Sequence, residues 1–162
     1  MALAVPLHAF RFHVSFTRDS IDGLGGGRGG AEEPLCDGAF SEVSGLEASL
    51  EPKTIREGGA NYGSHQRAGS VSYATVIFRR GLTEARDLWR WWEVFAGGAF
   101  AHRLTARVTH RDLDGRDLLG WRLERAMPVR FKAGDLNARA TEVAIEELHL
   151  VHEGLYFERP GG

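Results

Sequence analysis

Cysteine is nearly absent from this sequence, because Cys36 is the single one among 162 residues. A lone cysteine cannot form an internal disulfide, which excludes a disulfide-stapled secreted domain and favours synthesis in a reducing compartment. Long apolar runs are also missing, and no stretch approaches the ~20 residues that a membrane-crossing helix needs. The first residues carry neither a basic start nor a long apolar segment, so we expect no signal peptide.

A strong charge imbalance is missing as well. The formal net charge is −2, which argues against the simplest kind of nucleic-acid binder, a strongly basic domain. We therefore expect neither sequence-specific nucleic-acid binding nor stable membrane association. Lysine is scarce, with 2 residues against 18 arginines. Arginine suits interfaces, although a codon bias explains the ratio equally well.

The sequence does have the composition of a folded globular protein. Apolar residues make up 43% and charged residues 26% of the chain, values that are typical of a packed core with a polar surface. A chain of 162 residues has the length of one domain. We therefore predict a single domain over residues 1–162.

Apolar residues recur at every second position in several segments, which predicts half-buried β-strands. The clearest segment is His8–Thr17, in which three phenylalanines and a valine alternate with polar or small residues. Strand-like patterns also occur at 40–50, 53–59, 71–80, 103–110, 118–124 and 129–132. The last segment, 142–157, fits a strand or a helix, and its periodicity does not decide between them.

Loops are expected where glycine and polar residues gather. Residues 23–30 contain six glycines in eight positions. Because glycine loses much backbone entropy on ordering, we expect a mobile surface loop over about 22–35. Residues 60–70 are polar and interrupted by glycine, which indicates a second loop. Asp112–Gly115 is typical of a hairpin turn, and Gly45 is expected to mark a bulge or a close backbone approach.

One helix is expected, at about 83–96. Thr83 is placed to cap its first turn, and the glycine pair at 97–98 supplies a stop. Four apolar residues at three- and four-residue spacing form its predicted stripe: Leu88, Trp89, Trp92 and Phe95. Three tryptophans on one short helix (89, 91 and 92) predict an anchor packed against the body. All elements together indicate a mainly β or α+β fold, a sandwich or partly open barrel with one helix across it.

A catalytic constellation is not apparent in the sequence. Gly25–Gly30 formally matches a dinucleotide fingerprint, but no helical pattern follows it to hold a pyrophosphate. His149, His152 and Glu153 reverse the order of the zinc-protease motif, and residues three apart on a strand point to opposite faces. We therefore expect no enzyme, no catalytic residue, no cofactor and no metal site.

Several motifs follow one another in a specific order. The chain reads Phe-Ser-Glu-Val-Ser-Gly-Leu-Glu at 40–47 and Ile-Arg-Glu-Gly-Gly at 55–59. Further motifs are Phe-Arg-Arg-Gly-Leu at 78–82, Leu-Trp-Arg-Trp-Trp at 88–92, Trp-Arg-Leu-Glu-Arg-Ala-Met-Pro-Val at 121–129, Asp-Leu-Asn-Ala at 135–138 and the segment 142–154. This ordered set, over residues 8 to about 157, resembles the tail tube proteins of contractile phages and extracellular contractile injection systems, to which type VI secretion tubes are related.

The resemblance implies a fold and an assembly. The fold would be two packed antiparallel sheets forming a small barrel or sandwich with one flanking helix, with 142–157 as a strand. The protein would be a structural subunit of an inner tail tube: six copies close a ring, rings stack into a hollow tube, and sheath contraction drives the tube through a target envelope. The implied partners are further copies of the chain, a sheath protein, a baseplate hub, a tube terminator and a payload in the lumen. Such a protein is made in the bacterial cytoplasm and assembled into a phage tail or an injection particle.

The resemblance also suggests where the contacts lie. The segment from the glycine pair at 58–59 onward is similar to the long loop with which this family reaches an adjacent ring. Five residues there are the expected ring-stacking contacts: Gly58, Gly59, Tyr62, His65 and Arg67. Four polar members of one alternating strand are the expected lumen-facing residues: Arg103, Thr105, Arg107 and Thr109. Either face of that strand could be the buried one.

The segment 22–35 departs from the family pattern, because it is longer and richer in glycine than expected between the first two strands. A loop that projects into the contact between rings would block free polymerisation. Two alternatives therefore stay open. One is a single-ring tube initiator at the baseplate, and the other is an adaptor or cargo-binding protein with the tube fold.

Overall fold

The computed structural model describes residues 11–19, 33–38, 40–56, 58–59, 63–98 and 103–159, and every structural statement below concerns these residues. They form mostly β-strands with one helix. In chain order the elements are β1 (Phe12–Asp19), β2 (Glu33–Gly38), β3 (Glu42–Ser44), β4 (Ala48–Ile55), β5 (His65–Tyr73), β6 (Val76–Gly81), α1 (Asp87–Ala96), β7 (Arg103–Arg111), β8 (Asp117–Lys132), β9 (Ile145–Val151) and β10 (Gly154–Glu158).

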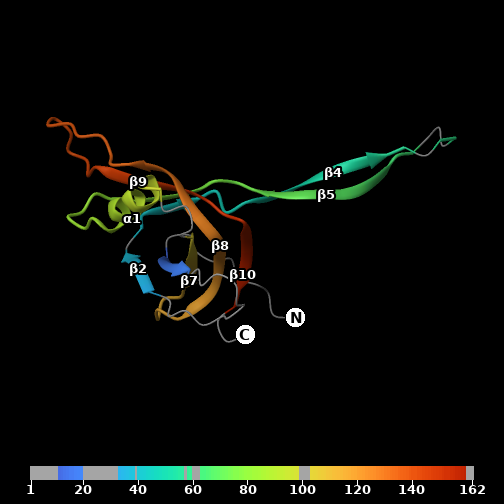
Figure 1. Cartoon of the computed structure of the whole chain (residues 1–162). Coiled ribbons are helices and arrows are strands. Elements are labelled where there is room, and N and C mark those ends of the chain that lie inside the picture. The colour runs from blue at the N-terminus through green and yellow to red at the C-terminus, as the bar shows by residue number, and fades with distance from the viewer. Residues whose placement is uncertain are drawn as a thin grey trace.

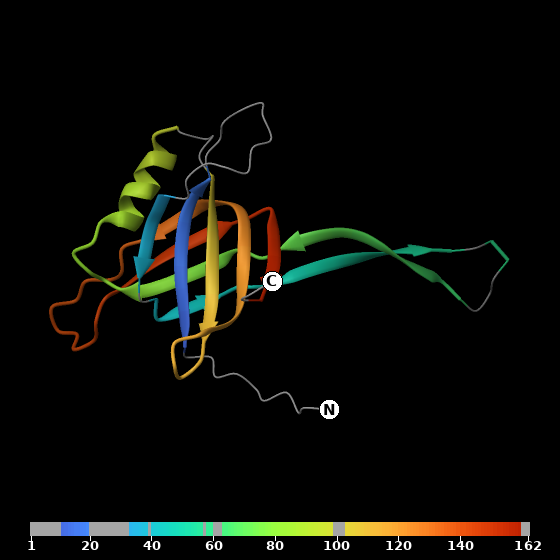
Figure 2. The same cartoon turned by 90° about the horizontal axis from the view of Figure 1, so that it is seen from below.

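The strands pair antiparallel in the order β2-β1-β7-β8-β9-β6-β3, with β10 also paired to β8. The long strand β8 belongs to two sheets, because its first half pairs with β7 and β10 and its second half with β9. It changes direction around Arg125, which has a φ of 51°, and its register to β9 shifts just after Pro128. The two sheets therefore face each other as a sandwich (Figures 1 and 2), and the predicted mainly β fold is confirmed. Among the described residues the ladder runs from the β2 edge to the β3 edge and does not close into a barrel.

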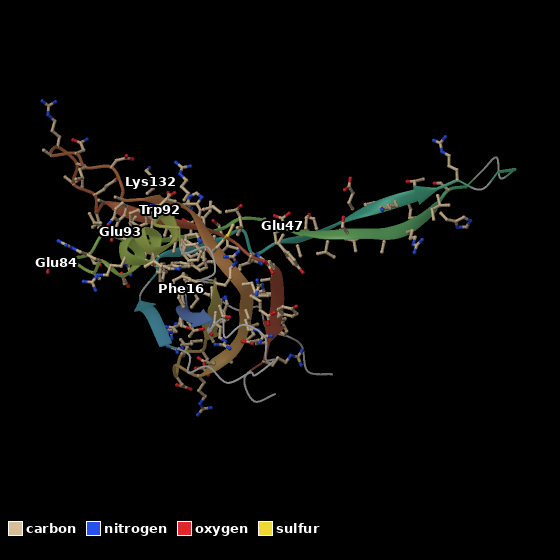
Figure 3. The ribbon with its side chains drawn as sticks, viewed as in Figure 1. Phe16, Glu47, Glu84, Trp92, Glu93 and Lys132 are labelled. Carbon is tan, nitrogen blue, oxygen red and sulfur yellow. The ribbon has the colours of Figure 1, made fainter. Side chains whose placement is uncertain are left out.

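The core lies between the two sheets and follows from the period-two patterns. On β7, Leu104, Ala106 and Val108 are buried while the residues between them are half-buried. Phe16 of β1 occupies the middle of the sandwich (Figure 3) and is fully buried. Its ring meets that of Phe78 edge to face, at 5.1 Å between centroids, a geometry that adds to the energy of burial.

The helix begins at Asp87 and not near Thr83, so the predicted start was wrong by about one turn. Thr83 Oγ1 accepts a hydrogen bond from the Ala85 N–H (3.3 Å) ahead of the helix, and the N-cap residue Arg86 makes no side-chain capping bond. Asp87 is held instead by Arg80 of β6, a partner that a local capping rule does not see. The predicted stop is confirmed, because the helix ends at Ala96 and the Gly97 N–H bonds to the Glu93 carbonyl.

Two of the predicted loops contain strands. β5 begins at His65, so most of the segment 60–70 is extended, and β2 begins at Glu33, inside the segment 22–35. The ladder to a neighbouring strand makes both segments regular, and neither has the apolar alternation that would reveal this in sequence. Residues 22–32 lie outside the described part of the chain. The ambiguous segment 142–157 contains the strands β9 and β10, as the family resemblance implied.

The remaining expectations about turns and breaks hold. The segment 112–115 joins β7 to β8 as a hairpin turn, with Gly115 at a φ of +80°. Gly45 separates β3 from β4, and a Cβ there would lie 2.2 Å from the Thr75 carbonyl oxygen. No helix in the described part of the chain is long and apolar enough to span a membrane.

Candidate functional site

The most unusual feature of the molecule is a long hairpin that leaves the sandwich. β4 and β5 pair only with each other and extend away from the body, on the side opposite α1 (Figures 1 and 2). Every residue of β4 is exposed, and so is every residue of β5 except Gly69 and Tyr73, which are partly covered. At its base, the Ala74 N–H donates to the Glu47 carbonyl over 3.1 Å, where the hairpin leaves the sandwich (Figure 3).

A bulge divides the hairpin into a base half and a distal half. Leu50 pairs with Val71, but the next partners are Pro52 and Ala68, so two residues of β5 lie opposite one residue of β4. One of those two is Gly69, where a Cβ would lie 2.0 Å from the Glu51 carbonyl oxygen. The strands can therefore approach this closely only because residue 69 has no side chain. Bulges of this kind bend a ribbon and redirect its end.

The base half of the hairpin has one apolar and one polar face. Successive side chains on a strand alternate in direction, and directly paired residues share a face. The pair Leu50 and Val71 therefore lies on the same face as Ala48 and Tyr73, and we call these four residues the apolar hairpin face. Leu50 is 50% and Val71 51% exposed. The opposite face carries small polar residues such as Ser49 and Ser72.

Four of the five predicted ring-stacking residues lie in the distal half of this hairpin. Gly58 and Gly59 form the turn at its tip, where Gly59 has a φ of +101°. His65 and Arg67 lie on β5 beyond the bulge, opposite Ile55 and Lys53, whereas Tyr62 lies outside the described residues. The structure thus brings four of the five together. Sequence reasoning missed the apolar hairpin face, because alternation makes Leu50 and Val71 look like core residues.

The predicted lumen-facing residues lie on the outer face of the sheet that contains β1 and β7. Thr105, Arg107 and Thr109 alternate with the buried residues of β7 and therefore point away from the core, as does Arg103. This open face belongs to the strands β2, β1, β7, β8 and β10, which lie side by side in Figure 2.

Ion pairs neutralise much of the charge on that face. Arg107 lies directly opposite Arg122 in the ladder, and both guanidinium groups reach Glu158, at 3.5 and 3.1 Å. Arg122 also contacts Glu124 at 3.0 Å and lies over the Tyr156 ring. A shallow hollow of about 660 Å³ opens beside Arg107 and Glu158. The face is polar, and the two neighbouring arginines share the carboxylate of Glu158.

A buried ion cluster joins α1 to the sheet that contains β6 and β9. Arg80 of β6, only 6% exposed, contacts Glu146 of β9 and binds Asp87 of α1 at 2.5 Å. Burial disfavours the charged guanidinium, but the hydrogen bonds that it donates to Asp87 and Glu146 outweigh this effect and raise the pKa of Arg80. One guanidinium thus joins carboxylates of α1 and β9, and we assign the cluster to holding α1 in place.

The two histidines of the zinc-like motif occupy different surroundings. His149 lies beside Glu147, at 3.1 Å, and together with Arg79 it lowers the pKa of that carboxyl group. His152 is buried and bonds through Nδ1 to the Gly154 carbonyl over 3.0 Å. In the described ranges no three His, Cys, Asp or Glu side chains are grouped so that they could hold a metal ion.

Comparison with known families gives one match that covers most of the chain. The family model described as T4-like virus tail tube protein gp19 matches residues 8–156. No curated protein matches the chain.

Several solved structures have a similar fold. A chain of the anti-feeding prophage baseplate, symmetrised six-fold, is 25% identical, with a TM-score of 0.80 and coverage of 98% of this chain and 99% of that one. A chain of the PVC extracellular contractile injection system, from its extended sheath–tube complex, is 18% identical, with a TM-score of 0.73 and coverage of 95% and 92%. Hcp1 of the E. coli EAEC 042 pathovar is 10% identical, with a TM-score of 0.53 and coverage of 94% of both chains.

Proposed function

The chain belongs to the family of T4-like virus tail tube proteins, and from this premise we propose that it is the repeating subunit of an inner tail tube. The tube would be that of a contractile phage tail or of a phage-tail-like injection system. In this proposal six copies close a ring and the rings stack into a hollow tube. Sheath contraction then drives the tube and its payload through the envelope of a target cell.

The observation that carries the proposal is the β4–β5 hairpin. A two-stranded ribbon with both faces in water is marginal by itself, and every residue of β4 and β5 except Gly69 and Tyr73 is exposed. Such an element gains stability when another molecule covers it. We propose that its distal half makes the contact between rings, through Gly58, Gly59, Tyr62, His65 and Arg67.

The open face of β7 and its neighbours suits a lumen. We propose that Arg103, Thr105, Arg107 and Thr109 line it, because they point away from the core on a broad polar sheet. A face whose arginines are neutralised by Glu158 and Glu124 would not hold a passing payload through a strong field of one sign. This role requires no catalytic group, cofactor or metal.

The proposed partners follow from the assembly. A tube subunit contacts its own copies, the surrounding sheath, the hub from which the tube starts and the terminator at its far end. The similar solved chains come from a baseplate, a sheath–tube complex, a tube-terminating cap and a sheath/tube terminator, which supports this set of partners. We propose assembly after synthesis in a bacterial cytoplasm, into a tail or an injection particle.

A second candidate is a single-ring initiator at the baseplate. The anti-feeding prophage baseplate chain, with a TM-score of 0.80 over nearly the full length of both chains, favours it. An initiator would use the same fold to form one ring, which then starts the tube. The two candidates differ in whether the ring stacks on copies of itself.

Negative-stain electron microscopy of the purified chain, with light scattering at rising concentration, separates the candidates. Hollow tubes or stacked rings are the result expected for a repeating tube subunit. Discrete rings that never stack would instead establish the initiator. A chain that forms no ring, even when a preassembled baseplate hub is added as a nucleus, would overturn both.

A further inference from the structure

An apolar groove lies at the end of the body opposite the hairpin. It has a volume of about 430 Å³, within the range of pockets that enclose small ligands. Its apolar lining comes from the segment before α1, from α1 itself and from the end of β8: Leu82, Ala85, Trp89, Phe131 and Ala133. Leu82 is 42% and Trp89 44% exposed. Large apolar side chains gathered around a hollow are typical of an interaction site.

Contacts inside the groove hold its shape. The Trp89 ring meets the Phe131 ring edge to face, at 5.3 Å between centroids. The indole Nε1–H donates to Glu93 Oε1 over 2.6 Å, which satisfies the one polar group of this side chain. Underneath, the buried Arg80–Asp87–Glu146 cluster fixes the start of α1. The groove is therefore preformed. Its polar lining consists of Thr83, Arg86 and Glu146, and the indole N–H of Trp89 is already paired.

The groove and the apolar hairpin face both expose large apolar side chains, and they lie at opposite ends of one chain. Figures 1 and 2 agree that the hairpin points away from α1, so it cannot fold back into its own groove. Figure 3 shows the same separation, with Glu47 at the hairpin base and Glu84 and Lys132 at the other end of the body. A contact between two different patches of identical molecules is head-to-tail, and its repetition closes a ring or continues as a stack.

We propose that the apolar hairpin face of one copy docks in the groove beside α1 of a second copy. Leu50 and Val71, paired side by side on the hairpin, enter between Leu82 and Trp89 of the neighbour. The proposal rests on the proposed function, since it requires the chain to assemble with itself, and it assigns the receiving surface of that contact. It also explains why one face of an otherwise water-exposed ribbon is apolar, since that face is covered in the assembly.

A pair of neighbouring residues provides the first test. Leu50→Asp places a charge on the apolar hairpin face, whereas Ser49→Asp places the same charge one residue away, on the opposite face of the same exposed strand. Both variants keep the core, so both should unfold at the same temperature as the wild type. The concentration at half-assembly, followed by light scattering, should rise by roughly tenfold or more for Leu50→Asp and little for Ser49→Asp. Equal assembly of the two variants would overturn the docking.

Disulfide trapping tests the receiving surface directly. In a Cys36→Ser background, Leu50→Cys protein is mixed with Leu82→Cys protein under mild oxidation, and the Leu50→Cys variant is replaced by Ser49→Cys in the control. The first mixture should form a cross-linked heterodimer and the control should not, as read on non-reducing gels with peptide mass spectrometry. Should the background substitution prevent folding, the charge variants still decide, because they keep Cys36.

The outcomes separate this inference from the function on which it rests. Wild-type rings or tubes without the 50–82 cross-link, or with unimpaired Leu50→Asp assembly, would refute the docking and leave the tube proposal standing. A wild-type chain that never associates, even with a nucleating hub, would remove both. Loss of assembly in Leu50→Asp together with the specific cross-link would establish the contact.

Discussion

At the scale of single residues, the three tryptophans of α1 have three different surroundings. Trp91 is 6% exposed and packs against Phe16, with the ring centroids 5.8 Å apart. Trp89 lies in the groove, and Trp92 is half-buried. The sequence pattern assigned Trp89 and Trp92 to the buried stripe, whereas the structure places Trp91 there. On a helix with indoles at three of four successive positions, periodicity predicts an anchor but not its rotation.

The first prediction concerns which indole stabilises the fold. Trp91→Ala should lower the free energy of unfolding by about 3–5 kcal/mol, because it leaves a cavity in the aromatic core. Trp92→Ala is the matched control on the same helix and should cost less than about 2 kcal/mol. Urea unfolding followed by circular dichroism measures both. A larger loss for Trp92→Ala would show that the helix presents a different face to the core.

A buried histidine predicts how stability depends on pH. His152 packs against the Tyr73 ring, at 5.0 Å between centroids, and its Nε2 is buried without a hydrogen-bond partner in the described part of the chain. Burial lowers the pKa of His152, and its hydrogen bond to the Gly154 carbonyl offsets only part of this effect. Below the ordinary value of about 6.5, the unfolded chain therefore binds a proton that the folded chain resists.

The contribution of neutral His152 to the free energy of unfolding is therefore fully present above about pH 6.5. It is lost as the pH falls through the lowered pKa of the folded state. His152→Phe keeps a ring against Tyr73 but cannot titrate. On going from pH 7.5 to pH 5.5, the unfolding midpoint of the wild type should fall further than that of His152→Phe. A difference that stays constant over this interval would mean that His152 takes up its proton as readily in the folded chain as in the unfolded one.

At the scale of elements, the regular core strands could be predicted and the hairpin could not. Strands such as β7 show in sequence because one face is buried, so apolar residues recur at period two. β5 begins with His65, Gln66 and Arg67, and both of its faces meet water, so no alternation marks it. Its regularity comes from the backbone ladder with β4, and backbone pairing alone requires no particular side-chain pattern in the sequence.

The bulge at Gly69 provides a prediction about the direction of the hairpin. Gly69→Ala would place a Cβ 2.0 Å from the Glu51 carbonyl oxygen, so the bulge must rearrange and the distal half must point elsewhere. Gly63→Ala is the control, because a Cβ there meets nothing within 4 Å. Both variants should keep the thermal midpoint of the wild type to within a few degrees, but only Gly69→Ala should fail to form rings or tubes. Normal assembly of Gly69→Ala, checked by electron microscopy, would show that the contact of the hairpin with a neighbouring copy does not depend on the bulge.

At the scale of the whole molecule, the body has a hydrophobic core to which the hairpin contributes no residue. The core cluster draws on β1, β6, β7, β8, β9 and α1 and on Phe40, and it includes no residue of β4 or β5. The family resemblance, and not a local pattern, led to the prediction of ring-stacking residues in the distal half of the hairpin, and their role in stacking stays a prediction. The sequence could not indicate that Leu50 faces solvent or that Leu82 and Trp89 form a groove. Both facts depend on where β4, α1 and β8 come to lie in space, which the pairing order of the folded chain determines.

That separation predicts that the body folds without the hairpin. Ala48 and Tyr73 are directly paired at its base, so replacing residues 49–72 by Asn-Gly would join them through a two-residue turn of the favoured type. Tyr73 stays against His152, and every residue of the core cluster is kept. The thermal midpoint should therefore remain within a few degrees of the wild type, while light scattering and electron microscopy find only unassembled protein. A shortened chain that still forms rings would assign ring closure to the strand edges of the sandwich and restrict the hairpin to stacking, because the hairpin could no longer supply any contact.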